Sequence, residues 1–458
     1  MEAACCEREG VDSKRYPLSL VQEWFLTLSG GDEVGPFGGR YLIVSVLRIA
    51  GEVDVEVLQE ALDDVVTRHE LLRTVVVGNA DPPYQLVCPP CRVPLEVRDL
   101  NLPAADGSRE AAVQQVMAEA HAETISAREV PLLRGLLCRF DDQDSALYLT
   151  VHHSVCDGWS VQVILRDLGA FYAARTAGTA PTLPEMRQYR EYAEWQRATA
   201  ASTSDEGALA YWAGKLDGAR EFVMPNDHGH PGRYAKPYSL HVFGIDAETM
   251  AAAAALAAAV RGTRFMVMLS AFYVLAYQIT GATDLTLNAV TSGRDDLRFH
   301  DTMGMFLNTV PFRTQIGGYT TFRDIVAETR ETFIDAMAHE LPIGVLEQAI
   351  PGYPHPREDT RVSQVLIMQP PAQYGQVVFP IADGATEVDE VLLEQDHSSS
   401  ILGGTEWHLN GQPDGAVSGS VHFNRGEFED STVHGWTDRL RRVLASAVRD
   451  PDQDWRQL

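Results

Sequence analysis

The chain has 458 residues, of which 45% are hydrophobic and 22% are charged, a composition typical of globular proteins. Because one hydrophobic core rarely extends over this length, we expect two domains or lobes. The formal net charge of -27 argues against nucleic acid as a partner, since phosphate binding requires a basic surface.

The sequence also argues against a membrane partner. The longest apolar run, residues 265–279, is shorter than the roughly 20 residues that span a bilayer. Residues 1–7 have neither the basic start nor the apolar core of a signal peptide. We therefore expect a cytoplasmic protein.

The six cysteines do not resemble the disulfide framework of a secreted protein. Cys88 and Cys91 have the spacing of half a zinc or redox site, but no second pair accompanies them. The two prolines between them favour a rigid loop, so we predict no metal site here. Cys156 is interpreted as a spacer within a turn rather than as a thiol nucleophile.

Apolar periodicity divides the first part of the chain into alternating helices and strands. We predict helices over residues 19–25, 55–66 and 109–127, strands over 41–49 and 146–153, a strand that resumes within 68–75, and a helix from Gly158 onward. Residues 176–184 are rich in Ala, Thr, Gly and Pro and predict a loop. Helices over 189–198 and 209–216 follow.

The second part of the chain repeats this mixture after residues 225–237, whose His, Gly and Pro content predicts a boundary. We predict helices over 251–260, 265–279 and 433–448, and strands over 284–290, 308–313, 362–368 and 417–423. Helices alternate with strands in both parts, which predicts an α/β fold of two similar lobes. The predicted division is a tail at 1–15, a first lobe at 16–184, linking helices and a loop at 185–237, and a second lobe at 238–458.

The most informative segment is residues 152–158, two adjacent histidines followed after three spacers by Asp-Gly. The unperturbed pKa of histidine lies close to neutrality, so His152 or His153 could exchange a proton at working pH. If the strand persists to His153, that residue shares the apolar face and His152 lies on the other, so their roles should differ. Asp157 could fix a ring or pair with a cation. Gly158 permits either an unusual backbone shape or a close approach of substrate.

Seven segments in order along residues 15–455 resemble the motifs of the condensation domains of nonribosomal peptide synthetases, within the chloramphenicol-acetyltransferase-like acyltransferases. The segment at 152–160 is similar to the HHxxxDG motif of that family. The histidines distinguish the chain from heterocyclising relatives, which have aspartate there. The seven segments are residues 19–25, 68–74, 152–160, 189–195, 303–311, 339–342 and 361–363.

The resemblance implies two chloramphenicol-acetyltransferase-like lobes in a V shape with a central tunnel. It also implies acyl transfer from the phosphopantetheine arm of a carrier protein to an amine or alcohol, with no metal and no cofactor bound by the enzyme itself. His153 matches the catalytic position, where it accepts or orients the proton of the nucleophile. His152 and Asp157 match supporting positions, and Arg294 matches the arginine that pairs with this aspartate.

Other residues receive roles from the same reasoning. The Gly158 N–H, at a helix start, is a candidate oxyanion donor, and Trp159 is a supporting residue of the same motif. Arg68 is expected to hold a helix-to-strand corner rather than to contact substrate. Asn308 could hydrogen-bond backbone at the lobe junction or line the tunnel, and residues 189–195 are expected to pack the lobes together.

No adenylation signature and no carrier serine context occur in the sequence. We therefore expect a free-standing condensation enzyme with a separate acyl or peptidyl carrier protein, which transfers an aminoacyl group (a β-aminoacyl group included) to a hydroxyl or amine. In this respect it resembles the ester-forming condensation enzymes of enediyne antibiotic pathways. Two alternatives remain, a coenzyme-A-dependent O-acyltransferase, which shares a shorter HxxxD motif, and a non-catalytic recruiting module.

Overall fold

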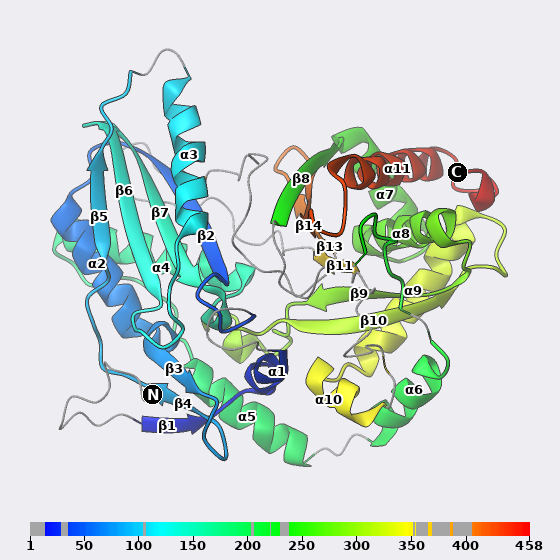
Figure 1. Ribbon diagram of the computed structural model, residues 1–458, viewed down its shortest axis with the longest axis horizontal. Coiled ribbons are helices and arrows are strands. Elements are labelled where there is room, and N and C mark those ends of the chain that lie inside the picture. The colour runs from blue at the N-terminus through cyan, green and yellow to red at the C-terminus, as the bar shows by residue number, and fades with distance from the viewer. Residues whose placement is uncertain are drawn as a thin grey trace.

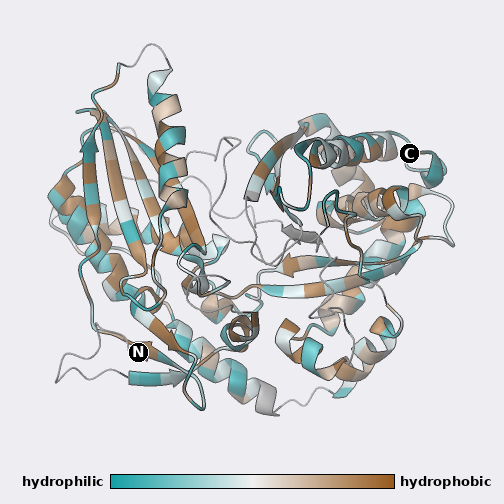
Figure 2. Ribbon diagram, viewed as in Figure 1, coloured by the Kyte–Doolittle hydropathy of each residue, from teal (hydrophilic) through white to brown (hydrophobic). Residues whose placement is uncertain are grey.

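The computed structural model describes residues 14–28, 35–103, 107–202, 206–219, 221–229, 238–350, 353, 365–368, 385–387 and 405–458. Its two larger sheets lie side by side, each with helices packed against it (Figure 1). Figure 2 shows that the strands of the first of these sheets are largely hydrophobic, whereas those of the second alternate between hydrophobic and hydrophilic residues. We call the part built on the five-stranded sheet the first lobe and the part built on the six-stranded sheet the second lobe.

The first lobe has strands in the order β12-β2-β7-β6-β5. Helices α2 and α4 pack together beneath one face of this sheet, and α3 packs on the other face. A smaller sheet in the order β1-β4-β3 lies beside α5. The elements are β1 Lys14–Pro17, α1 Leu20–Leu28, β2 Leu42–Ala50, α2 Val55–Arg68, β3 Thr74–Val77, β4 Tyr84–Val87, β5 Leu95–Asp99, α3 Ser108–Ala122, β6 Leu133–Asp141, β7 Asp144–His152, α4 Gly158–Ala177 and α5 Tyr189–Ser202.

Strand β7 is buried on both faces. Leu147, Leu149 and Val151 belong to the core under α2 and α4, as predicted, whereas Tyr148 belongs to the core under α3. The predicted extent of the strand is wrong by one residue, because His153 begins a 3-10 turn, His153–Val155, instead of continuing the strand. His153 therefore does not share the apolar strand face.

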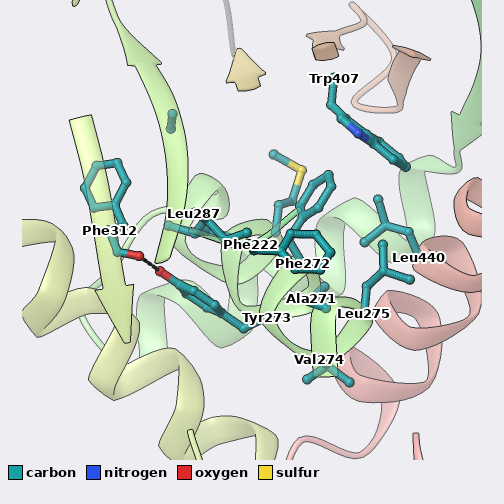
Figure 3. Packing of buried hydrophobic residues seen from close by; sticks show 14 of the residues in the cluster. Phe222, Ala271, Phe272, Tyr273, Val274, Leu275, Leu287, Phe312, Trp407 and Leu440 are labelled. Atoms are coloured by element: carbon teal, nitrogen blue, oxygen red, sulfur yellow. Dashed lines mark hydrogen bonds between the residues drawn. The ribbon is translucent and has the colours of Figure 1, made fainter. Parts of the chain in front are cut away.

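The second lobe has strands in the order β10-β9-β11-β13-β14-β8. Its core contains α8, which is buried at every position from Met266 to Ala276, as its nearly all-apolar sequence predicts. In this core Tyr273 donates a hydrogen bond of 2.7 Å to the carbonyl of Phe312 (Figure 3). The elements are α6 Glu206–Leu216, β8 Tyr238–Ile245, α7 Ala247–Ala259, α8 Arg264–Thr280, β9 Asp284–Thr291, β10 Asn308–Gln315, α9 Phe322–Ala338, α10 Ile343–Ala349, β11 Val365–Met368, β13 Thr405–Gly411, β14 Val417–Asn424 and α11 Asp430–Arg449.

Two segments from the later part of the chain belong to the first lobe. Strand β12, Ala385–Glu387, pairs antiparallel with β2. Phe299, Met303 and Phe306 are buried in the core under α2 and α4. In the opposite direction, the indole N–H of Trp24 in α1 donates a 2.9 Å hydrogen bond to Glu347 in α10. These exchanges join the two lobes at several places.

Most predicted elements are present with shifted ends. The helix predicted over 109–127 is wrong at its end, because α3 ends at Ala122 and the backbone N–H of Ile125 donates instead to the Gly39 carbonyl at 2.8 Å. Of the predicted strand at 362–368, residues 365–368 form β11; residues 361–364, the tail at 1–13 and residues 230–237 lie outside the described residues. Among the residues that the structure describes, no single helix could span a membrane by length and hydropathy; α7 and α8 pass that test only as a pair, bent by 103°.

Candidate active site

His152 ends strand β7 and is completely buried. Its Nε2 lies 3.1 Å from the Gly38 carbonyl oxygen, and its Nδ1 accepts hydrogen bonds from the N–H and hydroxyl of Ser154 at 3.2 and 2.8 Å. A carbonyl can only accept and a backbone N–H can only donate, so the ring is neutral with its proton on Nε2. Burial also lowers the pKa of His152 to about 4. Both ring nitrogens hold the turn, and the supporting role in the reaction stays a prediction.

His153, the next residue, has a half-buried ring with a different environment. The ring stacks on Tyr41 with centroids 4.4 Å apart and planes 8° from parallel. Its Nδ1 is buried with no hydrogen-bond partner among the described residues. Burial lowers the pKa of His153, so the imidazole is neutral near pH 7. In a neutral imidazole with its proton on Nδ1, Nε2 carries the lone pair that can accept a proton.

Asp157 caps the N-terminus of α4, where its Oδ1 accepts from the Ser160 N–H at 2.7 Å. The Arg294 guanidinium donates to both carboxylate oxygens, at 3.1 and 3.3 Å, which confirms the predicted pair. The Phe306 N–H donates to Oδ2 at 3.2 Å. We refer to Asp157, Ser160, Arg294 and the backbone of residues 304–306 as the Asp157–Arg294 cluster.

Arg294 is almost completely buried, and its charge is compensated on several sides. It also donates to the carbonyls of Phe299 and Thr302 at 2.9 and 2.6 Å. Its guanidinium carbon lies 3.9 Å from the centroid of the Phe306 ring, a cation–π contact. A carboxylate with this many donors is held in place.

The sequence interpretation missed Ser160 as a site residue. Its hydroxyl lies 2.7 Å from Asp157 Oδ1 and 2.8 Å from the Gly304 carbonyl, and it accepts from Arg294 and from the Gly304 N–H, both at 2.9 Å. The spacing Asp157-x-x-Ser160 at a helix start is a capping signal that could have identified it. Ser160 therefore links α4 to the segment from the second part of the chain.

Tyr189 was predicted to pack the lobes, and it contacts this same segment. Its hydroxyl donates to the Met305 carbonyl at 2.5 Å and lies 2.8 Å from the Ser19 hydroxyl. Gly304 lies against the Tyr189 ring so closely that an added Cβ would come within 2.1 Å of it. Motif residues from the N-terminus, α5 and residues 303–311 thus meet beside the Asp157–Arg294 cluster.

Gly158 and Trp159 begin α4. No atom lies within 4 Å of the position of a Cβ on Gly158, and its backbone is not left-handed. Of the two predicted reasons for glycine, the unusual backbone shape is therefore wrong, and the approach of a substrate remains a prediction. Its N–H precedes the intrahelical hydrogen bonds of α4, so the oxyanion role also stays a prediction. The Trp159 indole donates to the His300 carbonyl at 2.9 Å, which anchors the helix start.

Two other predicted residues have structural contacts. Arg68 donates to Asp167 at 2.8 Å and to the Pro184 carbonyl at 2.6 Å, which confirms the expected scaffold contact. The Asn308 amide donates to Glu340 at 2.8 Å and to the Leu341 carbonyl at 2.9 Å, and its oxygen accepts from the Ile343 N–H at 2.8 Å. Of the two alternatives for Asn308, backbone hydrogen bonding is the one observed, within the second lobe.

Cys156 lies in the first-lobe core, and burial raises its pKa well above the ordinary value. The thiol is therefore a poor nucleophile, in agreement with its interpretation as a spacer. Among the described residues, no group of three or more His, Cys, Asp or Glu is arranged to hold a metal. The site thus offers one neutral, unpartnered imidazole beside a rigidly held helix start, an arrangement suited to taking a proton from a nucleophile.

Comparison with known proteins places these residues in a family context. A family model described as Condensation domain matches residues 12–458. Phosphinothricin tripeptide synthetase PhsC of Streptomyces viridochromogenes is 31% identical over 451 residues, 96% of this chain and 40% of that protein. Chondramide synthase cmdD of Chondromyces crocatus is 30% identical over 440 residues, 95% of this chain and 11% of that protein. The chain thus spans less than half the length of these relatives.

Solved structures share the fold. SgcC5 from Streptomyces globisporus, in complex with (R)-(-)-1-(2-naphthyl)-1,2-ethanediol and sucrose, matches with a TM-score of 0.85 and 33% identity over 96% of this chain and 100% of that chain. The X-domain from teicoplanin biosynthesis, in complex with OxyB, matches with a TM-score of 0.78 and 25% identity over 96% and 95% of the two chains. These matches confirm the predicted α/β fold of two chloramphenicol-acetyltransferase-like lobes.

Proposed function

The chain belongs to the condensation-domain family, and we propose that it transfers an aminoacyl group from the phosphopantetheine thioester of a separate carrier protein to a hydroxyl or amine acceptor. The product is an ester or an amide, and the donor can be a β-aminoacyl group. The observation that carries this proposal is the unpartnered, neutral imidazole of His153 next to the fully hydrogen-bonded imidazole of His152.

The chemistry follows from this geometry. Nε2 of His153 takes the proton of the acceptor hydroxyl as its oxygen attacks the thioester carbonyl carbon. The carbon–sulfur bond then breaks, and the proton passes from the imidazolium to the phosphopantetheine sulfur, which leaves as the thiol. The Gly158 N–H, at the start of α4, is our candidate for stabilising the oxyanion between these steps. Binding donor and acceptor together in the predicted tunnel would supply further acceleration.

A hydroxyl acceptor is the form of this proposal that we favour. SgcC5, which resembles the chain over its whole length, was solved with an aryl-substituted ethanediol. A hydroxyl also needs base assistance more than a free amine does, and His153 is available as the base. The acceptor is therefore proposed to be a small aryl or alkyl alcohol, with ester formation.

Mass spectrometry of reaction products tests the proposal. One aminoacyl group is offered on a holo carrier protein and on coenzyme A, each with 1-phenyl-1,2-ethanediol and with the corresponding 2-amino alcohol. We expect the ester mass from the carrier-bound donor, and a much weaker signal from coenzyme A. Equal or better turnover of the coenzyme A donor would favour the O-acyltransferase alternative.

The complex of the X-domain with OxyB gives a reason to keep a recruiting module as the second candidate. A recruiting module needs no catalytic base, whereas this chain carries His153. Absence of ester and amide products with both donors, from protein whose cooperative unfolding shows that it is folded, would favour the recruiting function.

A further inference from the structure

Tyr41 lies directly before strand β2 and opposite the His153 turn. In the antiparallel pairing of β2 with β7, Leu42 is the partner of His152. Just beyond this pair, the backbone N–H of His153 donates a hydrogen bond of 2.7 Å to the Tyr41 carbonyl. Residues opposite one another on antiparallel strands have neighbouring side chains. The strand register therefore brings the phenol ring of Tyr41 to the imidazole of His153.

The two rings are stacked face to face. Their centroids are 4.4 Å apart and their planes are 8° from parallel. Contacts at this distance are favourable over the whole ring area, and tilting the imidazole would either lose them or press its edge into the phenol ring. The stack therefore restricts rotation of the imidazole plane.

This restriction matters because the imidazole lacks the usual orienting contact. A catalytic histidine is ordinarily oriented by a hydrogen bond to the ring nitrogen that does not take the proton. Nδ1 of His153 has no such partner among the described residues. The nearby carboxylate of Asp157 is bonded to Arg294 instead. Stacking on Tyr41 can take the place of that hydrogen bond.

The Tyr41 ring is itself supported from behind. The edge of Phe25 in α1 meets it, with centroids 6.2 Å apart and planes at 83°. Phe25 is completely buried and packs in turn on Phe37, at 6.4 Å and 80°. The same buried cluster contains Met305, from the backbone segment of the Asp157–Arg294 cluster. Tyr41 is thus a half-buried ring held by the core on one side and in contact with the imidazole on the other.

We propose that Tyr41 is a positioning residue for acyl transfer, whose ring holds the His153 imidazole in the orientation in which Nε2 takes the proton of the acceptor. This inference rests on the proposed function. A cation over the face of a tyrosine ring is attracted to it, so the stack persists when the imidazole becomes an imidazolium during the reaction. Tyr41 acts through His153 and needs no contact with donor or acceptor.

Two substitutions of Tyr41 test this inference, with kcat and KM measured for the carrier-bound aminoacyl donor and 1-phenyl-1,2-ethanediol. Tyr41→Leu removes the aromatic ring and keeps the backbone hydrogen bond to His153. It should lower kcat by about 10- to 100-fold and change KM less than about 2-fold, because a misplaced reacting group slows the chemistry and not the binding. Tyr41→Phe keeps the ring and should retain most of kcat.

Nuclear magnetic resonance of protein labelled at histidine gives a second measurement that requires no turnover. The His153 ring signals are those that disappear in His153→Ala. The ring current of a stacked phenol moves the signals of the facing imidazole upfield. We expect this upfield shift in the wild-type protein and in Tyr41→Phe, and its loss in Tyr41→Leu. An unchanged position of the signals in Tyr41→Leu would show that the rings do not stack, which overturns the inference.

A matched variant separates positioning from packing. Phe37→Leu removes a ring from the same buried cluster and leaves the stack on His153 in place, so kcat should be retained. Equal losses of kcat in Phe37→Leu and Tyr41→Leu would assign the effect to packing.

Other kinetic outcomes also overturn the inference. Unchanged kcat in Tyr41→Leu would show that the imidazole needs no stack, and a raised KM alone would make Tyr41 a substrate contact. An equal loss in Tyr41→Phe would assign the effect to the hydroxyl. Absence of turnover by the wild-type protein would instead overturn the proposed function, and a retained ring-current shift would then mark the stack as a structural contact only.

Discussion

The His153 turn and the Asp157–Arg294 cluster lie only a few residues apart, but their polar atoms are used in opposite ways. In the cluster, Asp157 accepts from Ser160, Arg294 and the Phe306 N–H. Nδ1 of the His153 ring has no hydrogen-bond partner among the described residues, and the ring stacks on Tyr41. The comparison teaches that the satisfied polar groups hold this part of the fold together, and it makes the unsatisfied imidazole the group that our proposal assigns to the substrate.

The largest expected effect on activity comes from removing the His153 imidazole. His153→Ala should lower kcat by about 100- to 10,000-fold, the usual contribution of a general base. Thermal unfolding should change little, since Nδ1 of the His153 ring has no hydrogen-bond partner among the described residues. Near wild-type turnover would rule out the mechanism. A large fall in Tm would show that His153 stabilises the fold, as the Asp157–Arg294 cluster is expected to do.

The next largest effect is expected in the Asp157–Arg294 cluster. Asp157→Ala leaves the buried Arg294 charge unpaired, which should cost about 3–5 kcal/mol of unfolding free energy, and should reduce soluble yield and activity. Denaturant titration measures this cost. Arg323→Gln, at an exposed ion pair with Asp452, is a suitable control with a smaller loss. Loss of activity with unchanged unfolding in Asp157→Ala would argue against the structural role.

His152 should contribute to stability and to its pH dependence. Its pKa is lowered by burial to about 4, so the unfolded state binds a proton that the folded state does not between that value and about 6.5. Unfolding free energy should therefore fall as the pH falls through this range. In His152→Asn we expect a loss of about 1–3 kcal/mol at pH 7 and a weaker dependence on pH. An unchanged slope would show that His152 is not the group responsible.

Among these variants, Gly158→Ala should have the smallest effect on the free energy of unfolding. Its kinetics test directly whether a substrate approaches Gly158. A Cβ there meets no atom within 4 Å, so unfolding free energy should change by less than about 0.5 kcal/mol. If a substrate approaches this position, kcat/KM should nevertheless fall, and steady-state kinetics would show it. Unchanged kinetics would mean that the glycine is not needed for substrate approach.

Local patterns predicted much of the fold. The apolar spacing in β7, the continuous apolar run of α8 and the Asp157 cap at the start of α4 are each contained in a few neighbouring residues. The ends of helices and strands were less predictable, because they depend on contacts with residues distant in the sequence. The helix predicted to residue 127 ends at Ala122, where Ile125 hydrogen-bonds Gly39 instead.

From the sequence alone we could recognise the two histidines, the Asp-Gly spacing and, through the ordered motifs, the family. Only the tertiary structure decided that both His152 nitrogens are hydrogen-bonded and that Nδ1 of His153 is not. It also decided that Ser160 contacts Gly304, 144 residues away. The physical reason is that satisfaction of a polar group and the field at an imidazole depend on atoms close in space, which periodicity along the chain does not record.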